Sequence, residues 1–354
     1  MSQSNDHSQS IQERVAAAVR SGAALEIQGS GSKRFLGRTP TGEPLATTEH
    51  TGIVNYEPTE LVLTARTGTR LAELEQILAD AGQMLPFEPP QFGGEGTLGG
   101  AIATGLSGPA RPFAGAARDL VLGCRLVNGR GEDVHFGGEV MKNVAGYDVS
   151  RLQAGALGTL GVLLEVSLKV LPRPEKELAL ALELDRDDAF RQVSDWQAKG
   201  APVTGSAHDG QRLHLRLSGS ALGVDAAREM IGGEAEDLQF WQDLRDHRLP
   251  WFQDQAQLWR VALPPGRQLP EQLLHNALLD WNGQQVWLGG EQDFSALHQA
   301  ARAVGGHARS FRGGDREADV LPSNGGIFQH LHRNIKKAFD PEGILNPGRL
   351  YADF

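Results

Sequence analysis

Apolar residues recur at helical spacing in two stretches near the start of the chain, 11–22 and 69–82. Each stretch ends at a glycine, which commonly terminates a helix because it accepts a left-handed backbone conformation. Ser10 and Glu13 also have the spacing of a capping box, in which two side chains satisfy free backbone N–H groups. The pattern therefore predicts two amphipathic helices, the first of them capped by Ser10.

Short apolar runs predict strands around these helices. We expect strands at 25–28, within 60–66 and at 162–170, where apolar and mostly polar residues alternate before two prolines. Apolar runs also flank Asn128 and Gly129, a pair that favours the turn of a two-residue hairpin. These patterns predict a strand-rich first part of the chain.

The segment 83–119 lacks a clear period and is predicted to be mostly loop. Its length far exceeds the roughly 4–6 residues of a usual connection, and long ordered loops in compact domains are generally functional. Apolar residues within it, such as Leu98 and Ile102, favour an ordered loop.

The run PRPEKE, which begins at Pro172, is the strongest candidate for a domain boundary. Beyond it, strands and helices alternate twice, which predicts an α+β domain with two related halves, the second containing a helix within 270–278. The predicted boundaries are 1–174, 175–320 and a tail at 321–354.

The charge balance is acidic, because 34 Lys and Arg stand against 44 Asp and Glu, a formal net charge of −10. Without a long basic tract, this charge argues against binding to nucleic acid or anionic lipid. The single Cys124 cannot hold a disulfide, a Cys-based zinc site or an iron–sulfur cluster, and is predicted to be a core residue. A polar N-terminus and the lack of an apolar stretch of about 18 residues predict a cytoplasmic protein.

Glycine is over-represented, with 44 residues among 354, against about 7% on average. The first Gly-rich segment, GSGSKR, fails the dinucleotide pattern G-x-G-x-x-G because Arg34 stands at the third glycine, which leaves either a diphosphate-binding nest or an ordinary turn. The second, GTLGGAIATGLSG, either packs tightly on a helix or brings the N–H groups of Gly99 and Gly100 to a flat ring or diphosphate.

The order of the motifs resembles the FAD-binding family typified by vanillyl-alcohol oxidase. The motifs that follow the family's order, over 25–174 and 339–349, are IQGSGSK, EGTLGGAIATGLSGP, RDLVLGCRLVNGRGE, GGEVMKNVAGYDVSRLQAGALGTLG and DPEGILNPGR. Over its whole length the chain is similar to the FAD-binding (E) subunits of glycolate oxidases, also called glycolate dehydrogenases. This resemblance implies an α+β fold in which 1–174 is a two-subdomain FAD-binding domain, 175–320 a cap domain, and 321–354 a tail that returns to the FAD domain.

The resemblance also implies cofactor contacts at individual positions. It places the GSGSK loop at the FAD diphosphate, the GTLGG segment along the diphosphate and the isoalloxazine edge, and residues 161–162 at the adenine end. The tail returns an asparagine near the flavin. The implied FAD-binding residues are Gly29, Ser30, Gly31, Ser32, Lys33, Gly96, Thr97, Gly99, Gly100, Thr104, Gly161, Val162 and Asn346. No catalytic residue or metal ligand is assigned.

Histidine placement limits the predicted chemistry. Some family members attach FAD covalently through a histidine, but 25–37 contains none, so FAD is expected to be non-covalent. The His-rich cap segments of related 2-hydroxy-acid dehydrogenases have no clear counterpart, and His307, the nearest candidate, is interpreted as a surface residue. His330 and His332 stand two apart on a predicted helix, so they point to different faces and make a poor chelate.

The resemblance implies an FAD-binding subunit of a glycolate-oxidising complex, in which a 2-hydroxy acid passes a hydride to flavin N5 and becomes a 2-oxo acid. Electrons would leave for an acceptor other than oxygen through a second flavin (D) subunit and an iron–sulfur (F) subunit. These partners could hold the chain at the inner face of the cell membrane. Two alternatives stay open: a non-catalytic FAD-containing assembly subunit, and a stand-alone flavin oxidase of another alcohol.

Overall fold

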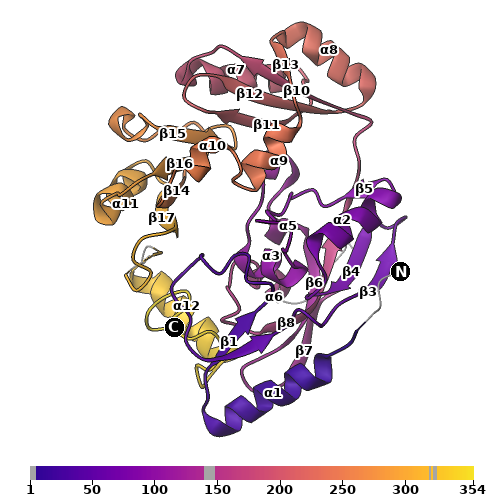
Figure 1. Cartoon of the computed structure of the whole chain (residues 1–354), viewed down its shortest axis with the longest axis vertical. Coiled ribbons are helices and arrows are strands. Elements are labelled where there is room, and N and C mark those ends of the chain that lie inside the picture. The colour runs from indigo at the N-terminus through magenta and orange to yellow at the C-terminus, as the bar shows by residue number, and fades with distance from the viewer. Residues whose placement is uncertain (1–4, 139–147, 319, 322–324) are drawn as a thin grey trace. The chain divides into compact units, whose positions relative to one another are not determined.

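The chain folds into two compact units, each built on its own antiparallel sheet (Figure 1). The structure is a computed structural model that describes residues 5–138, 148–318, 320–321 and 325–354. The first unit comprises 1–106, 116–172 and 315–354. The second comprises 107–115 and 173–314, so the excursion that contains α4 (Arg111–Ala114) groups with it.

The first unit contains a five-stranded sheet with the order β3-β4-β8-β6-β7. Its strands are β3 (Ile53–Glu57), β4 (Val62–Arg66), β6 (Val121–Val127), β7 (Asp133–Gly137) and β8 (Val162–Lys169). The predicted strands and the β6–β7 hairpin are confirmed. Its turn is longer than the predicted two residues, because the Asn128 side chain accepts bonds from the N–H groups of Arg130 and Glu132.

Helices and short strands complete the first unit. They are α1 (Ser8–Ser21), β1 (Leu25–Gln28), β2 (Glu43–Ala46), α2 (Leu71–Asp80), β5 (Gln83–Met84), α3 (Leu98–Thr104), α5 (Ala117–Leu120), α6 (Val149–Leu152), β9 (Leu171–Pro172) and α12 (Gly326–Phe339). One apolar core joins the sheet to α2, α3 and α5. A second joins α1, β1 and β2 to the tail residues Ile344 and Leu345, so the end of the chain is part of this unit's interior.

The cap predicted for the first helix is wrong. The first helix begins at Ser8, so Ser10 lies inside it and forms no capping box. The Asp6 carboxylate instead accepts a bond from the N–H of Ser8, and hydrogen bonds to Ser8 and Arg66 hold the pKa of Asp6 well below its usual range. The segment 83–119 is mostly loop, as predicted, with β5 and the short helices α3, α4 and α5 within it or at its end. These helices are too short to produce a helical period in the sequence.

The second unit contains an eight-stranded antiparallel sheet with the order β13-β10-β12-β11-β15-β16-β14-β17. Its strands are β10 (Lys176–Leu182), β11 (Val203–His208), β12 (Leu213–Gly219), β13 (Glu234–Glu236), β14 (Leu258–Ala262), β15 (Ala277–Asp280), β16 (Gln285–Gly289) and β17 (His307–Arg312). Each half has its four strands in the spatial order 4-1-3-2 or its reverse, and the halves join where β11 pairs with β15. The predicted pair of related halves is thus confirmed in topology, which is that of a split β-α-β unit.

Helices α7 (Arg186–Ala198), α8 (Ala221–Ile231) and α11 (Phe294–Ala303) follow the predicted pattern in this unit. The helix predicted within 270–278 is wrong: η1 (Glu271–Leu273) is one 3-10 turn, and β15 starts at Ala277. Two short helices, α9 (Gln239–Arg245) and α10 (Pro250–Gln253), link the two halves. Among the described helices of both units, none is long and apolar enough to cross a membrane.

Candidate cofactor site

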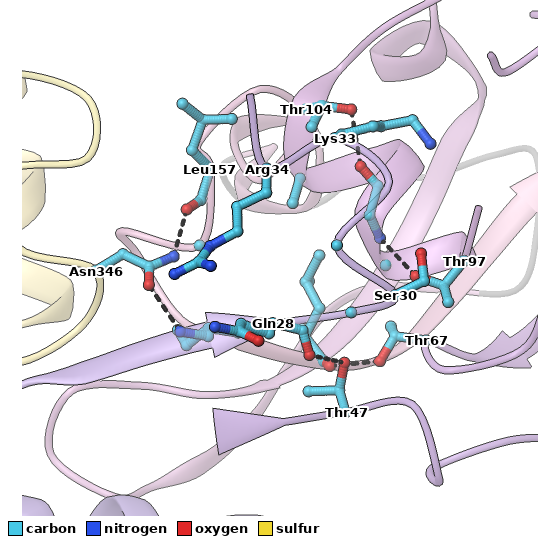
Figure 2. A pocket seen from close by; sticks show the side chains of 18 of the residues that line it. Gln28, Ser30, Lys33, Arg34, Thr47, Thr67, Thr97, Thr104, Leu157 and Asn346 are labelled. Atoms are coloured by element: carbon cyan, nitrogen blue, oxygen red, sulfur yellow. Dashed lines mark hydrogen bonds between the residues drawn. The ribbon is translucent and has the colours of Figure 1, made fainter. Parts of the chain in front are cut away.

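A cavity in the first unit brings together most of the Gly-rich residues that the sequence singled out (Figure 2). Together with open solvent at its mouth, it holds about 830 Å³ of space that no atom occupies. Its walls are β1 and the turn after it, α3, the segment 157–163 and the tail. The predicted residues that line it are Gly29, Ser30, Gly31, Ser32, Lys33, Thr97, Gly99, Gly100, Thr104, Gly161 and Asn346.

Two of the predicted residues are not among those that line the cavity. A Cβ at Gly96 would lie 3.2 Å from Nζ of Lys33 and 2.9 Å from Leu71, so this glycine lies behind the lysine. The Val162 side chain is fully buried and packs in the core that contains α1 and the tail. Both therefore support neighbouring lining residues.

The turn after β1 offers free backbone donors to the cavity. Within the described residues, the N–H groups of Gly29, Ser30, Gly31 and Ser32 donate to no protein acceptor. Gly31 has φ +79°, and a Cβ there would meet nothing within 4 Å, so the turn requires its conformation rather than its small size. Successive free N–H groups in a turn form a concave binding site for an anion.

The charged side chains that line the cavity are mostly basic. Lys33 is buried, with Nζ 3.5 Å from Oγ of Ser32. Arg34 makes two bonds, at 2.9 and 3.0 Å, to the carboxylate of Glu26. Arg349 donates to the carbonyls of Arg34 and Arg38, and burial lowers its pKa to about 10. Three cations against one carboxylate make this a positive site in a chain of net charge −10.

Helix α3 presents its first turn to the cavity, but its N–H groups are already used. Thr97 caps the helix by accepting a bond from the N–H of Gly100, and the N–H of Gly99 donates to the carbonyl of Thr67 at 2.8 Å. The expected donation of these two N–H groups to a ligand is therefore wrong. A Cβ at Gly99 would lie 2.8 Å from Cβ of Thr67, so this glycine lets α3 approach the end of β4.

The tail reaches the cavity through Asn346, which has φ +44°. Its Oδ1 accepts a bond from the N–H of Ile27 and its Nδ2 donates to the carbonyl of Leu157, both at 2.7 Å (Figure 2). A Cβ at Gly158 would lie 2.7 Å from this Nδ2, so the 157–158 turn needs glycine there. Asn346 thus ties β1 to the opposite wall.

A buried ion pair holds the tail in place. Lys336 of α12 donates to the Asp340 carboxylate at 2.7 Å and to the carbonyls of Thr159 and Leu345. Asp340 in turn accepts from the N–H groups of Ile344 and Leu345. The tail motif DPEGILNPGR is therefore a folded hook that delivers Asn346 and Arg349 to the cavity.

Several lining residues were missed from the sequence, namely Glu26, Gln28, Arg34, Thr47, Thr67, Leu157, Gly158 and Arg349. Gln28, Leu157, Gly158 and Arg349 lie within motifs that carried the family resemblance, so their place in those motifs could have identified them. The remaining four, Glu26, Arg34, Thr47 and Thr67, lie outside those motifs. Part of the motif GGEVMKNVAGYDV, residues 139–147, lies outside the described residues.

The histidines and the cysteine lie away from this cavity. Cys124 is buried, and burial raises the pKa of its thiol to about 12, which confirms the predicted core role. His330 contacts Asn334, whereas His332 contacts Tyr351, so the two histidines serve different neighbours. In the part of the chain that the structure describes, no group of three or more His, Cys, Asp or Glu residues could hold a metal ion.

Comparison with known proteins identifies the group this cavity suits. Residues 5–137 match the family model described as an FAD binding domain, and residues 313–350 match that of the C-terminal domain of FAD linked oxidases. Among solved structures, p-cresol methylhydroxylase with substrate bound is 14% identical, with a TM-score of 0.77 over 98% of this chain and 87% of that chain. Alkyldihydroxyacetonephosphate synthase is 15% identical, with a TM-score of 0.68 over 97% of this chain and 75% of that chain. These likenesses place the two-unit architecture in the same fold.

The fold and the family matches define an FAD-dependent oxidoreductase subunit. The chain belongs to the family of the glycolate oxidase subunit GlcE of Escherichia coli (strain K12), with which it shares 47% identity over 348 residues, 98% of each chain. It is also 33% identical to the glycolate oxidase subunit GlcD of Bacillus subtilis (strain 168) over 181 residues, 50% of this chain and 38% of that one. The cavity fits FAD by its free N–H donors and its positive charge.

Proposed function

We propose that the chain is the FAD-binding subunit of a glycolate-oxidising enzyme that converts a 2-hydroxy acid to a 2-oxo acid. The observation that carries this proposal is the cavity of the first unit, which free N–H groups and three cations line. The family supports the substrate class, because the related chains from Escherichia coli and Bacillus subtilis are named as glycolate oxidase subunits.

In this proposal the chain's residues hold FAD without a covalent bond. The N–H groups of the turn at 29–32 and the Lys33 ammonium bind the diphosphate, whose charges they neutralise. The backbone of Gly99 and Gly100 lies along the isoalloxazine ring of FAD, and Thr97 and Thr104 flank this backbone. Gly161, supported by Val162, meets the adenine end, Gly96 supports Lys33, and Asn346 fixes the spacing of the walls. When bound, FAD supplies hydride acceptance at flavin N5.

The same proposal gives the remaining parts of the chain their roles. The unit at 173–314 acts as the cap domain and the tail completes the FAD domain. With its single cysteine buried, the chain has no ligands for an iron–sulfur cluster, so electrons leave through partners. These partners are a second flavin (D) subunit and an iron–sulfur (F) subunit, which pass electrons to a non-oxygen acceptor and can hold the complex peripherally at the inner membrane face.

Reconstitution tests this function. The full chain is purified, its FAD content is measured, and glycolate-dependent reduction of an artificial acceptor is followed with and without the partner subunits. A general base near neutral pH is worth about 10²–10⁴ in rate, and none of the described residues that line the cavity is a histidine. We therefore expect the chain alone to be at least about 10²-fold slower than the complex. Equal rates would instead favour a stand-alone oxidase, and no glycolate oxidation by the complex would refute the proposal.

A further inference from the structure

The sheet of the second unit carries a group of arginines that the proposed cofactor site does not use. Arg260 on β14 and Arg309 on β17 are direct cross-strand partners. Like charges directly opposite each other in an antiparallel pair are destabilising. Neither arginine forms an ion pair with a described residue, and Nε of Arg309 is buried without a hydrogen-bond partner. Nε of Arg260 donates a hydrogen bond to the neutral side chain of Gln285.

A third arginine reaches the same place from the excursion at 107–115. The guanidinium carbons of Arg111 and Arg260 lie 4.4 and 4.8 Å from the centre of the Trp281 ring. Trp281 is itself buried, and its Nε1 donates to the carbonyl of Gly108 at 3.0 Å. Both guanidinium groups therefore contact the same indole ring.

The turn that presents Trp281 is strained. Trp281 and Asn282 have φ values of +58° and +55°, a left-handed conformation that costs energy for residues other than glycine. The Asp280 carboxylate stabilises this turn by accepting from the N–H of Trp281 and from Gln285. Strain of this kind persists where the surroundings enforce it and is concentrated at functional sites.

The electrostatics of the cluster call for an anion. Burial, followed by the charges of Arg309 and Arg111, lowers the pKa of Arg260 far below its ordinary value, while Asp280 acts in the opposite direction. Burial lowers the pKa of Arg309 to about 10. Partial burial and the charges of Arg260 and Arg309 also lower the pKa of His307, which favours its neutral form. Arg260 and Arg309 thus place two positive charges opposite each other with no ion pair to a described residue.

We propose that Arg260, Arg309 and Arg111, arranged around Trp281, bind the carboxylate of a small 2-hydroxy or 2-oxo acid. A guanidinium presents N–H donors in a planar fork that matches the two oxygens of a carboxylate. The choice of acid rests on the proposed function, whereas the anion site rests on this cluster alone. The second unit would then recognise the charged end of the substrate or product.

Binding of glycolate to the FAD-loaded full chain, followed by calorimetry and by tryptophan fluorescence, tests this site. We expect saturable binding of glycolate and none of the neutral isostere glycolamide. Arg260→Gln and Arg309→Gln should each weaken glycolate binding roughly tenfold or more, because a charge-assisted hydrogen bond is lost. Arg302→Gln, an exposed arginine on α11, is the matched control and should leave the affinity unchanged.

The outcomes are separable. FAD content and melting temperature establish that each variant is folded, and Arg309→Lys, which keeps the charge but not the fork, provides a milder change. Equal affinity of wild type and the double Arg260→Gln/Arg309→Gln variant for glycolate, or equal binding of glycolamide, would overturn the site. If chloride at the same concentration displaced glycolate, the arginine cluster would be a general anion site, and the assignment to a carboxylate would be overturned. If the reconstituted complex oxidises glycolate but the arginine variants bind it as tightly as wild type, only the proposed anion site is refuted. If the chain binds glycolate through these arginines but the complex does not oxidise it, the proposed function is refuted instead.

Discussion

Single residues of the tail and the glycine segments decide the shape of the cofactor cavity. Asn346 uses both ends of its side chain to join β1 to the 157–158 turn, more than 180 positions earlier in the chain. Asparagine is suited to this position because it tolerates the left-handed backbone at φ +44° and offers a donor and an acceptor together.

Asn346→Ala should therefore lower the stability of the chain and its affinity for FAD. It leaves the N–H of Ile27 and the carbonyl of Leu157 without their partner, at about 1–3 kcal/mol for each buried group. Thermal unfolding and FAD titration measure both effects. Asn334→Ala, on the exposed side of the same tail, is the control. Unchanged FAD affinity in Asn346→Ala would show that this bridge does not shape the cavity.

The two adjacent glycines of α3 should respond differently to alanine. A Cβ at Gly99 would lie 2.8 Å from Thr67, whereas one at Gly100 would meet only Oγ1 of Thr97, at 3.2 Å. Gly99→Ala is expected to cost about 1–3 kcal/mol by overpacking and to reduce FAD occupancy. Gly100→Ala gains up to about 1 kcal/mol of helix propensity, which offsets its contact. Flavin absorbance per chain and melting temperature would distinguish them; a larger loss in Gly100→Ala would contradict the assignment.

At the scale of single residues, the sequence predicted which residues line the cavity better than it predicted their hydrogen bonds and charges. Gly-rich motifs and family order located the turn at 29–33, the segment at 97–104 and Asn346. They could not show that the N–H of Gly99 is occupied, because its acceptor Thr67 lies some thirty positions earlier and only folding brings it there. The role of Arg34 was missed because its partners Glu26 and Arg349 meet it only in the folded chain.

Among the structural elements, the tail hook depends on one buried pair. Removing Asp340 leaves the Lys336 ammonium without its counter-ion, a change that typically costs about 3–5 kcal/mol. Asp340→Ala should therefore destabilise the first unit and weaken FAD binding, since the hook delivers Asn346. Lys336→Met should cost less, because Asp340 keeps its bonds to the N–H groups of Ile344 and Leu345. Chemical denaturation of both variants measures the difference, and equal losses would argue against this ranking.

A histidine clamp makes the second unit sensitive to pH. Burial acts to lower the pKa of His214, but the contact of its Nε2 with the Asp209 carboxylate at 3.3 Å and the hydrogen bond of its Nδ1 with Glu236 outweigh burial and raise the pKa from 6.5 to about 9. The folded chain then holds a proton that the unfolded chain releases above pH 6.5. The clamp's stabilisation is complete below this pH and is lost as the pH rises to about 9.

His214→Gln should remove this pH dependence. We expect the stability difference between wild type and variant to shrink by about 2–3 kcal/mol between pH 6 and pH 9.5, in proportion to the pKa shift. Unfolding by urea at a series of pH values, followed by tryptophan fluorescence, measures the difference. His275→Gln serves as the control, because His275 is exposed. A difference that is constant with pH would refute the clamp.

Long elements with a regular spacing of apolar residues were predicted well, and short elements were not. The amphipathic spacing of α2 and the alternation in β8 survive in the structure because each buries one regular face. The helix expected within 270–278 failed because Leu274, Ala277 and Leu279 are buried in the core of the second half by a turn and a strand. Local spacing cannot distinguish these outcomes when tertiary packing decides them.

At the scale of the whole molecule, two local sites have a charge opposite in sign to the net charge of the chain. The chain is acidic, yet the cofactor cavity and the arginine cluster around Trp281 are basic. Negative charge elsewhere repels nonspecific polyanions, while local positive charge attracts small anions such as a diphosphate or a carboxylate. Composition alone predicted the negative net charge. It could not predict the two basic sites, because each of them brings together basic residues from distant segments.

FAD should be held by these charges and hydrogen bonds without a covalent bond. Within the described residues, the cavity is lined by no histidine, cysteine or tyrosine that could attach to the flavin. Heat or acid precipitation of the holo-chain should therefore leave the yellow colour in the supernatant. Because FAD would bind the folded state alone, added FAD at about 100 times its Kd should stabilise the apo-chain by about 2.7 kcal/mol, detectable as a higher melting temperature. Raised ionic strength should reduce this stabilisation, since screening weakens the attraction of Lys33 for the diphosphate. Flavin that stays with the precipitated protein would instead demonstrate a covalent link and place a reactive side chain at a cavity that holds none among the described residues.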